Sequence, residues 1–598
     1  MYVSGVRIYN LLIGFYYGMP RVSALIWLDQ SYRVTTYNRY IAYSQTFDVM
    51  LCATCLISLI ITRYIVVAIW KHRLLPRSLN GVYQTFKSTA HGSASLCSLK
   101  RLYQLYEKDG IPIGSILKSS SYDNPQDVIQ NIQKKKTKDI LRLKVDHSVV
   151  IAPSGAGKGI GIVIPTLLDY EGSVLVTDIK GENYAVTAEA RRKKGRKVYA
   201  LDPFRITDRR SLGFFNVLDF LDPTQESVVD DSATLAHLLC PVSSYESGVS
   251  QYFASQAAAV LQCLILYVVY SKDIKQEDKH LGTVYDLLCQ DSGLLKNLFC
   301  TMGENKQACY GAPARLANRI LGTESRELSG TLNSACLELR FLESSEVRHS
   351  VSRSNFSLEE LVTGKSDLYL CIPSEKLEVQ SRLLRLMVGS VFMMVQKARG
   401  KVSERKFLML LDEMPALGYM SQIENALTYG RGYGVSLMVI SQTLERLKSV
   451  YPQSWQTFLS CPLSLFFGTS DYETSELVSE SLGKATVQTR SENKGYSHSK
   501  QEQEKFGATA SHSTSNQTGS SFSETGRALL TPDEVRRLDP HVLIAFLRGE
   551  NPILLQRLNY LTHPHYKNKF QTNPLHKKFG FAYRILICIP FWKLALLT

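Results

Sequence analysis

The chain has 598 residues, which is enough for several domains and argues against a single hydrophobic core. Hydrophobic residues make up 44% and charged residues 21%, so the composition excludes a disordered chain and describes a folded protein. The net charge of +15 favours polyanions or an anionic membrane surface as partners, although a solvated basic surface gives the same charge.

Residues 1–75 contain a predicted membrane anchor. Residues 49–70 are apolar over the length of a membrane span and are interrupted once, by Arg63. The cluster of basic residues that follows places that end of the span on the cytoplasmic side. Residues 8–28 form a second candidate span, broken by a Pro-Arg pair. A cleaved signal sequence or a buried core helix is the alternative, which the late start and the basic flank disfavour.

A strand-turn-helix pattern at residues 149–166 is typical of a loop that binds nucleotide phosphates. Backbone N–H groups of such a loop converge on the phosphates, and a lysine adds a positive charge. Against the pattern G-x-x-x-x-G-K-[ST], Ala152 replaces the first glycine and Gly159 replaces the hydroxyl residue that binds Mg²⁺. An ordinary tight connection between strand and helix is the alternative. The predicted nucleotide-binding residues of the loop are Ser154, Gly155, Ala156, Gly157, Lys158 and Gly159.

Alternating strands and helices around this loop predict an α/β domain, whose first part is residues 76–224. A strand at 173–178 ends at Asp178, and another strand at 197–201 follows a helical stretch. In a parallel sheet, ligands bind at the carboxyl ends of the strands. Asp178 is therefore a candidate nucleotide-site residue, with a role in a structural turn as the alternative.

An all-helical segment, residues 225–355, interrupts this pattern. Apolar residues recur there at helical spacing, and strand signals are missing from its sequence. The α/β pattern resumes with a strand at 367–373 and a helix at about 376–399, so residues 356–487 are the predicted second part of the same domain.

Two later strands end in polar residues that ATP hydrolysis requires. The apolar strand at 406–413 ends in Asp412 and Glu413, which we predict to hold Mg²⁺ and to polarise the attacking water. The next strand ends at Gln442, whose amide is suited to contact the γ-phosphate. Arg431, in a glycine-rich loop, is a candidate for a finger that reaches a neighbouring subunit's nucleotide, with an ordinary surface arginine as the alternative.

The C-terminal part of the chain is less informative. Residues 488–526 are rich in Ser, Gln, Lys, Glu and Gly and are expected to be a flexible segment. Regular structure is expected to return at Thr531, which has the sequence of a capped helix start, within a final domain part at 527–570. The tail, residues 571–598, ends in an apolar stretch too short to span a bilayer and is assigned no role.

With these motifs in place, the chain resembles the TraG/VirD-type coupling proteins of type IV secretion and conjugative transfer systems. The resemblance extends from the N-terminal spans to about residue 565, and the number and order of the motifs make it specific. The matching stretches are HGSA at 91–94, residues 147–168 with their GKG variant, TDIKGEN at 177–183, LLDEMP at 410–415, ISQ at 440–442, GTSD at 468–471 and residues 527–535.

The resemblance implies a RecA-like P-loop NTPase domain with an all-helical insertion for substrate recognition and N-terminal transmembrane helices. It implies ATP and Mg²⁺ as cofactors, with Lys158 on phosphate and Arg431 acting in trans. The implied assembly is a homo-hexamer in the bacterial inner membrane, multi-pass, with most of the chain in the cytoplasm. Implied partners are DNA with its relaxase (the relaxosome) or effector proteins, components of the type IV secretion channel, and membrane lipid. Glycine after the lysine recurs in this family, but one Mg²⁺ ligand must then be replaced by water or another side chain.

The leading hypothesis is an ATPase that recruits a DNA–relaxase complex or effector proteins to the secretion channel and energises their transfer. One rival is a non-catalytic membrane docking receptor, in which Ala152 and Gly159 are signs of decay. The intact Asp412, Glu413 and Gln442 argue against it. A second rival is a chromosome-type DNA-translocating ATPase, which the helical insertion disfavours. The sequence leaves open whether the cargo is DNA, protein or both.

Overall fold

The computed structural model describes residues 57–58, 89–117, 125–134, 139–241, 248–398, 407–429, 432, 434–469, 471–500 and 512–573. The chain divides into two compact units, Met1–Ser88 and Thr89–Thr598, and the account below concerns the second. Both predicted membrane spans fall in the first unit and, apart from residues 57–58, lie outside the described residues. Most of the tail at 571–598 also lies outside them.

The second unit is built on an 11-stranded sheet with the strand order β2-β1-β13-β12-β9-β3-β8-β7-β4-β6-β5. Its strands are β1 (Ile111–Ile116), β2 (Asp139–Leu143), β3 (His147–Ile151), β4 (Val174–Asp178), β5 (Lys197–Leu201), β6 (Ser366–Cys371), β7 (Phe407–Leu411), β8 (Val435–Ser441), β9 (Leu463–Phe467), β12 (Val542–Leu547) and β13 (Ile553–Gln556).

The half of the sheet from β9 to β5 is parallel throughout. Strands β4 to β8 correspond to the five strands expected after the phosphate loop, which confirms the α/β prediction. Every residue of β3, β4, β7 and β8 is buried, as expected for apolar, β-branched runs covered by helices on both faces. The central order β3-β8-β7-β4 brings the strand ends that carry the predicted site next to one another.

The other half of the sheet is antiparallel and was not predicted. Strand β12 pairs with β9 and β13, and β1 pairs with β13 and β2. Strands from the start and the end of the unit therefore lie side by side, with Ser115 opposite Gln556.

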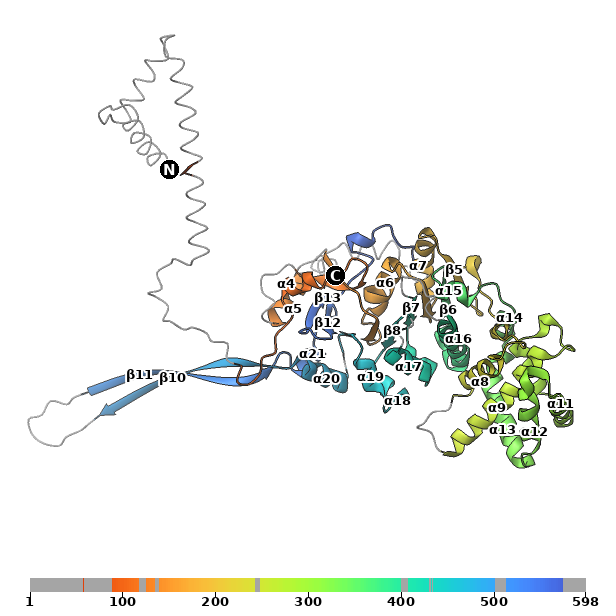
Figure 1. Cartoon of the computed structure of the whole chain (residues 1–598). Helices are drawn as coiled ribbons and strands as arrows, with labels where there is room; N and C mark the ends of the chain where they lie inside the picture. Colours follow the sequence, from red (N-terminus) through yellow and green to blue (C-terminus); the bar gives the residue numbers. More distant parts are fainter. Residues whose placement is uncertain are drawn as a thin grey trace, which may run out of the picture. The chain divides into compact units, whose positions relative to one another are not determined.

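Helices surround the sheet and connect its strands (Figure 1). Those of the α/β part are α4 (Leu99–Gln104), α5 (Pro125–Lys134), α6 (Ile164–Asp169), α7 (Glu182–Lys193), α16 (Leu377–Ala398), α17 (Ser421–Tyr429), α18 (Leu444–Val450), α19 (Trp455–Leu459), α20 (Tyr472–Leu482) and α21 (Pro532–Arg536). The capping box expected at Thr531 is present, with Glu534 as its partner.

The predicted all-helical segment is confirmed as helical within the described residues. Its helices are α8 (Val228–Leu239), α9 (Gly248–Tyr270), α10 (Leu281–Leu288), α11 (Ser292–Glu304), α12 (Ala312–Leu321), α13 (Ser325–Leu339) and α14 (Ser345–Ser350). A further short helix, α15 (Leu358–Val362), follows beyond the predicted end of the segment at residue 355. Figure 1 shows α8, α9 and α11–α13 grouped together, with α9 in contact with α8, α10, α12 and α13.

Helix α9 is the one helix in the described part of the chain that is long and apolar enough to cross a membrane. Its most apolar window is 56% buried, and it packs among four other helices. A core helix of a helical domain has the same length and composition, so α9 is explained by packing within the insertion.

The segment expected to be flexible, residues 488–526, instead contains a paired β-ribbon. Strands β10 (Lys484–Lys500) and β11 (His512–Ala528) run antiparallel, from Lys484 opposite Ala528 to Lys500 opposite His512 (Figure 1). The composition pointed to flexibility because neither strand has an apolar face, but backbone hydrogen bonds do not depend on side-chain polarity. At its base, the ribbon bonds to the start of the unit, where Ala94 N donates to Lys484 O over 3.0 Å.

Candidate nucleotide-binding site

The predicted phosphate-loop residues form one continuous turn between β3 and α6. Gly155 and Gly157 have φ of 78° and 85°, in the left-handed region that favours glycine. A Cβ at Gly155 or at Gly159 would meet no atom within 4 Å, so the loop is open at these two positions. Residues Gly159–Val163 form a π-helical turn that continues into α6. The N–H groups at the start of this helix therefore follow directly on the loop, as in an anion-binding site.

Lys158 joins the loop to the two acids that follow β7. Its Nζ lies 2.7 Å from Asp412 Oδ1 and 3.2 Å from Glu413 Oε2. Burial opposes the charge on the ammonium group, but the two carboxylates outweigh that effect, and the pKa of Lys158 is raised. Thr177 Oγ1, at the end of β4, donates to the Asp412 carbonyl over 2.8 Å and ties the acidic loop to the neighbouring strand. Lys158, Asp412 and Glu413, which the sequence offered as separate candidates, thus lie together at one edge of the sheet.

Glu413 has an unusual backbone for its residue type. Its φ of 57° and ψ of 45° lie in the left-handed region, which costs a residue with a side chain about 1–3 kcal/mol. The side chain is buried and accepts hydrogen bonds from Gln442 Nε2 at 2.9 Å and from Arg446 Nη1 at 2.8 Å. Arg446, on α18, was missed in the sequence, although it lies only four residues beyond Gln442. With Lys158, three donors fix the Glu413 carboxylate.

Asp178 lies at the end of β4, as predicted, but its hydrogen bonds are structural. One of its carboxylate oxygens, Oδ2, accepts from Tyr184 N at the start of α7, over 2.8 Å. This replaces the missing side-chain cap at Gly181, which has φ of 69°. Burial raises the pKa of Asp178 to about 7, with the Asp412 charge acting in the same direction and backbone N–H donors opposing both. Asp178 also lines a narrow space together with Asp412 and Glu413.

Arg557 was not predicted and contacts the phosphate loop directly. It follows β13, and its Nη1 donates to the Ala156 carbonyl over 2.5 Å. A Cβ added to Gly157 would lie 1.9 Å from that Nη1, and one added to Gly161 would lie 2.8 Å from the Arg557 Cγ. Both glycines therefore leave room for the arginine. Burial lowers the pKa of Arg557, and its Nε has no hydrogen-bond partner.

Two features stay predictions: the trans-acting role of Arg431 and the Mg²⁺ site. Arg431 lies outside the described residues, so its role as a trans-acting finger stays a prediction. Within the part of the chain that the structure describes, no group of three or more His, Cys, Asp or Glu side chains is arranged to hold a metal ion. A Mg²⁺ ion bound with a nucleotide needs only one or two carboxylates, because phosphate oxygens and water supply its other ligands.

A glycine-rich loop and its lysine, facing two acids and a glutamine from neighbouring parallel strands, define a P-loop NTPase fold of the RecA-like type. Residues 112–580 match the family model for type IV secretory system conjugative DNA transfer proteins. Because this match covers more than half of the chain, the protein belongs to that family.

Individual relatives agree with the family assignment. VirD4 of Rhizobium rhizogenes is 31% identical over 69% of this chain and 58% of its own length. TraG of Agrobacterium fabrum is 26% identical over 72% of this chain and 63% of its own length. The alignments thus span less than two thirds of these relatives. The solved structure of the coupling protein TrwB with a non-hydrolysable ATP analogue shares the fold, with a TM-score of 0.53 at 16% identity, covering 78% of this chain and 93% of TrwB.

Proposed function

We propose that this protein is a membrane-anchored, hexameric ATPase that brings a DNA–relaxase complex or effector proteins to a type IV secretion channel and energises their transfer. The observation that carries the proposal is the convergence of Lys158, Asp412, Glu413 and Gln442 at one edge of the parallel sheet. Membership of the conjugative DNA transfer family supports the cargo and the channel as partners.

ATP and Mg²⁺ are the proposed cofactors. TrwB has been solved with an ATP analogue and with ADP and Mg²⁺, and the residues of this chain fit the same ligands. The loop and Lys158 supply donors for the phosphates, and Asp412 supplies a carboxylate oxygen, the ligand type that Mg²⁺ prefers. Bound Mg²⁺ would neutralise phosphate charge during hydrolysis.

The contacts of Lys158 suggest how nucleotide binding changes the site. Its ammonium group pairs with Asp412 and Glu413, and binding of phosphates would give it new anionic partners. The Asp412 carboxylate would then be available to the metal ion. Glu413 accepts hydrogen bonds from Gln442 and Arg446, and its proposed role is to orient and polarise a water molecule.

Hydrolysis by the full-length protein in detergent tests the site. We expect Lys158→Ala to reduce ATP hydrolysis to background, and Glu413→Gln to do the same while nucleotide binding persists. Lys193→Ala, at the exposed end of α7, removes an equal charge away from the site and is expected to leave the rate unchanged. Full activity of Lys158→Ala would contradict the proposed site.

The membrane anchor, the hexamer and the cargo rest on the sequence and the family. The apolar stretch at 49–70 supports an inner-membrane anchor, and residues 8–28 are the candidate for a second span. The docking-receptor alternative predicts that Mg-ATP produces no thermal stabilisation, whereas an ATPase site predicts an upward shift of the unfolding temperature.

The protein or the DNA that co-purifies with the Glu413→Gln variant would identify the cargo.

A further inference from the structure

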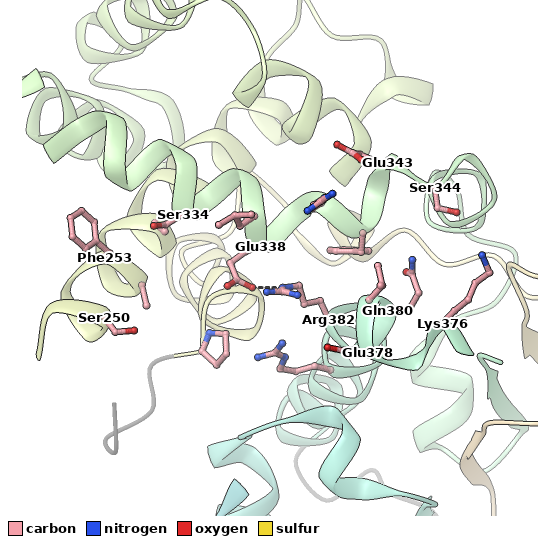
Figure 2. A pocket seen from close by; sticks show the side chains of 18 of the residues that line it. Ser250, Phe253, Ser334, Glu338, Glu343, Ser344, Lys376, Glu378, Gln380 and Arg382 are labelled. Atoms are coloured by element: carbon pink, nitrogen blue, oxygen red, sulfur yellow. Dashed lines mark hydrogen bonds and ion pairs between the residues drawn. The ribbon is translucent and has the colours of Figure 1, made fainter. Parts of the chain in front are cut away.

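An open cavity of about 1160 Å³ lies between the helical segment and α16, away from the nucleotide site. Its walls come from α9, from the end of α13 with the turn that follows, and from the first turns of α16. Figure 2 shows Phe253 of α9, Glu338 of α13 and Gln380 of α16 around this space. The cavity thus lies between the helical segment and a helix of the α/β part.

Arg385 is the unusual residue of this cavity. The residue is 7% exposed, and its Nε is buried without a hydrogen-bond partner. None of the described hydrogen bonds or ion pairs involves Arg385. Its neighbour one turn earlier, Arg382, is paired with Glu338, as the dashed line in Figure 2 shows. Burial lowers the pKa of Arg385 and outweighs the charge of the nearby Glu338, which favours the charged form of Arg385. A buried guanidinium without an ion pair or a hydrogen bond is costly, and a bound anion would offset that cost.

A second buried polar group lies on the same helix. Gln380 is 4% exposed, and its Oε1 also has no hydrogen-bond partner. The cavity therefore offers an unpaired cation and an unpaired acceptor within two turns of α16. A ligand with a carboxylate and a backbone N–H group would satisfy both.

The charges of the other lining residues favour a single carboxylate over a polyanion. The cavity is lined by four cationic side chains (Arg340, Lys376, Arg382 and Arg385) and by four acidic ones (Glu338, Glu343, Glu375 and Glu378). A polyanion such as DNA would meet these glutamates, whereas one carboxylate meets Arg385. Apolar side chains complete the wall, including Leu337 and Val379, which are 56% and 59% exposed. Such walls fit the apolar side chains of a peptide.

We propose that this cavity binds a carboxylate group of a peptide segment from a partner protein, with Arg385 as its anchor. The carboxylate can come from a chain terminus or from an acidic side chain, since both have the same planar, two-oxygen geometry that a guanidinium recognises. The site goes beyond the proposed ATPase function, and its binding is measured without nucleotide, so either proposal can fail alone.

Three peptides distinguish the sources of the carboxylate. The probes are acetyl-Leu-Ala-Phe-Ala with a free C-terminal carboxylate, the same peptide as its amide, and acetyl-Leu-Glu-Phe-Ala amide. Isothermal titration of the full-length protein in detergent is expected to give at least tenfold tighter binding for one or both carboxylate peptides than for the neutral amide. Equal affinity for all three would overturn the proposal.

Variants test the anchor. Arg385→Gln is expected to weaken binding of the carboxylate peptide at least tenfold and to leave the affinity for the amide peptide unchanged. Arg340→Gln, which removes an exposed arginine of the same cavity, is the matched control and is expected to bind normally. If Arg385→Gln does not fold, Glu338→Gln decides, because it removes the carboxylate that pairs with Arg382 and acts on the charge of Arg385, and should therefore tighten binding of the carboxylate peptide. No gain in that variant, or preferential displacement of the peptide by a single-stranded oligonucleotide, would refute a peptide carboxylate site.

Discussion

The contact between Arg557 and the phosphate loop predicts an energetic coupling between two residues far apart in sequence. Arg557→Ala removes a charge-assisted hydrogen bond to Ala156 O, worth about 1.5–3 kcal/mol. The same substitution removes the buried Nε that has no hydrogen-bond partner, and the cost of burying it disappears. The net loss in the free energy of unfolding is therefore about 1 kcal/mol.

Gly157→Ala carries two penalties. A side chain at φ of 85° costs about 1–2 kcal/mol, and a Cβ 1.9 Å from the Arg557 Nη1 must displace the guanidinium, at a further cost of about 1–2 kcal/mol. When Arg557 is already Ala, only the backbone penalty remains. The double variant should therefore be less destabilised than the sum of the single variants by about 1–2 kcal/mol.

Thermal unfolding of the full-length protein measures this coupling, which corresponds to roughly 1–2 °C for a unit of this size. Gly155→Ala is the matched control, because it has a similar φ of 78° but no atom within 4 Å of its Cβ. Its effect should add to that of Arg557→Ala without coupling. Strict additivity for Gly157→Ala, or the same coupling for both glycines, would refute the role given to Arg557.

Three further predictions concern single residues. Burial raises the pKa of Asp178 to about 7, so its protonated form stabilises the fold at low pH and that stabilisation is lost as pH rises from about 4 through 7. Asp178→Asn should remove this loss: between pH 5 and pH 8, the free energy of unfolding of the variant should change more favourably than that of the native protein by about 2–4 kcal/mol. Parallel pH profiles of the unfolding free energy for the two proteins would contradict this prediction. Gly159→Ser has open space for its side chain and should lower the Mg²⁺ concentration for half-maximal ATP hydrolysis about tenfold; an unchanged Mg²⁺ titration would show that the hydroxyl finds no metal. Asp367→Asn breaks a fully buried pair with Arg191 and should destabilise the protein by about 3–5 kcal/mol in urea unfolding, whereas a loss below about 1 kcal/mol would count against it.

The sequence was sufficient for those parts of the site that have a local signal. Each central strand is a short apolar run, and Asp412, Glu413 and Gln442 follow directly on such runs. Since the carboxyl ends of parallel strands meet at one edge, their convergence on Lys158 could be expected without knowing the strand order.

The residues that sequence reasoning missed depend on pairings between distant segments. Arg557 reaches the phosphate loop only because β13 is held by β1 and β12, and its own sequence context resembles that of any surface arginine. The β-ribbon was missed for a different reason. Its polar strands are held by a backbone ladder, and composition reports on apolar burial alone.

The antiparallel half of the sheet also sets the order in which the site is completed during synthesis. Arg557 is separated from Ala156 by 401 positions. At a synthesis rate of about 5–20 residues per second, the phosphate loop precedes its arginine by roughly 20–80 s. A nascent chain that stops before β13 carries the loop, Lys158 and both acids, but lacks the contact that anchors the loop from the far end of the unit. The candidate nucleotide site is therefore finished late, by a segment outside the motif that defines it.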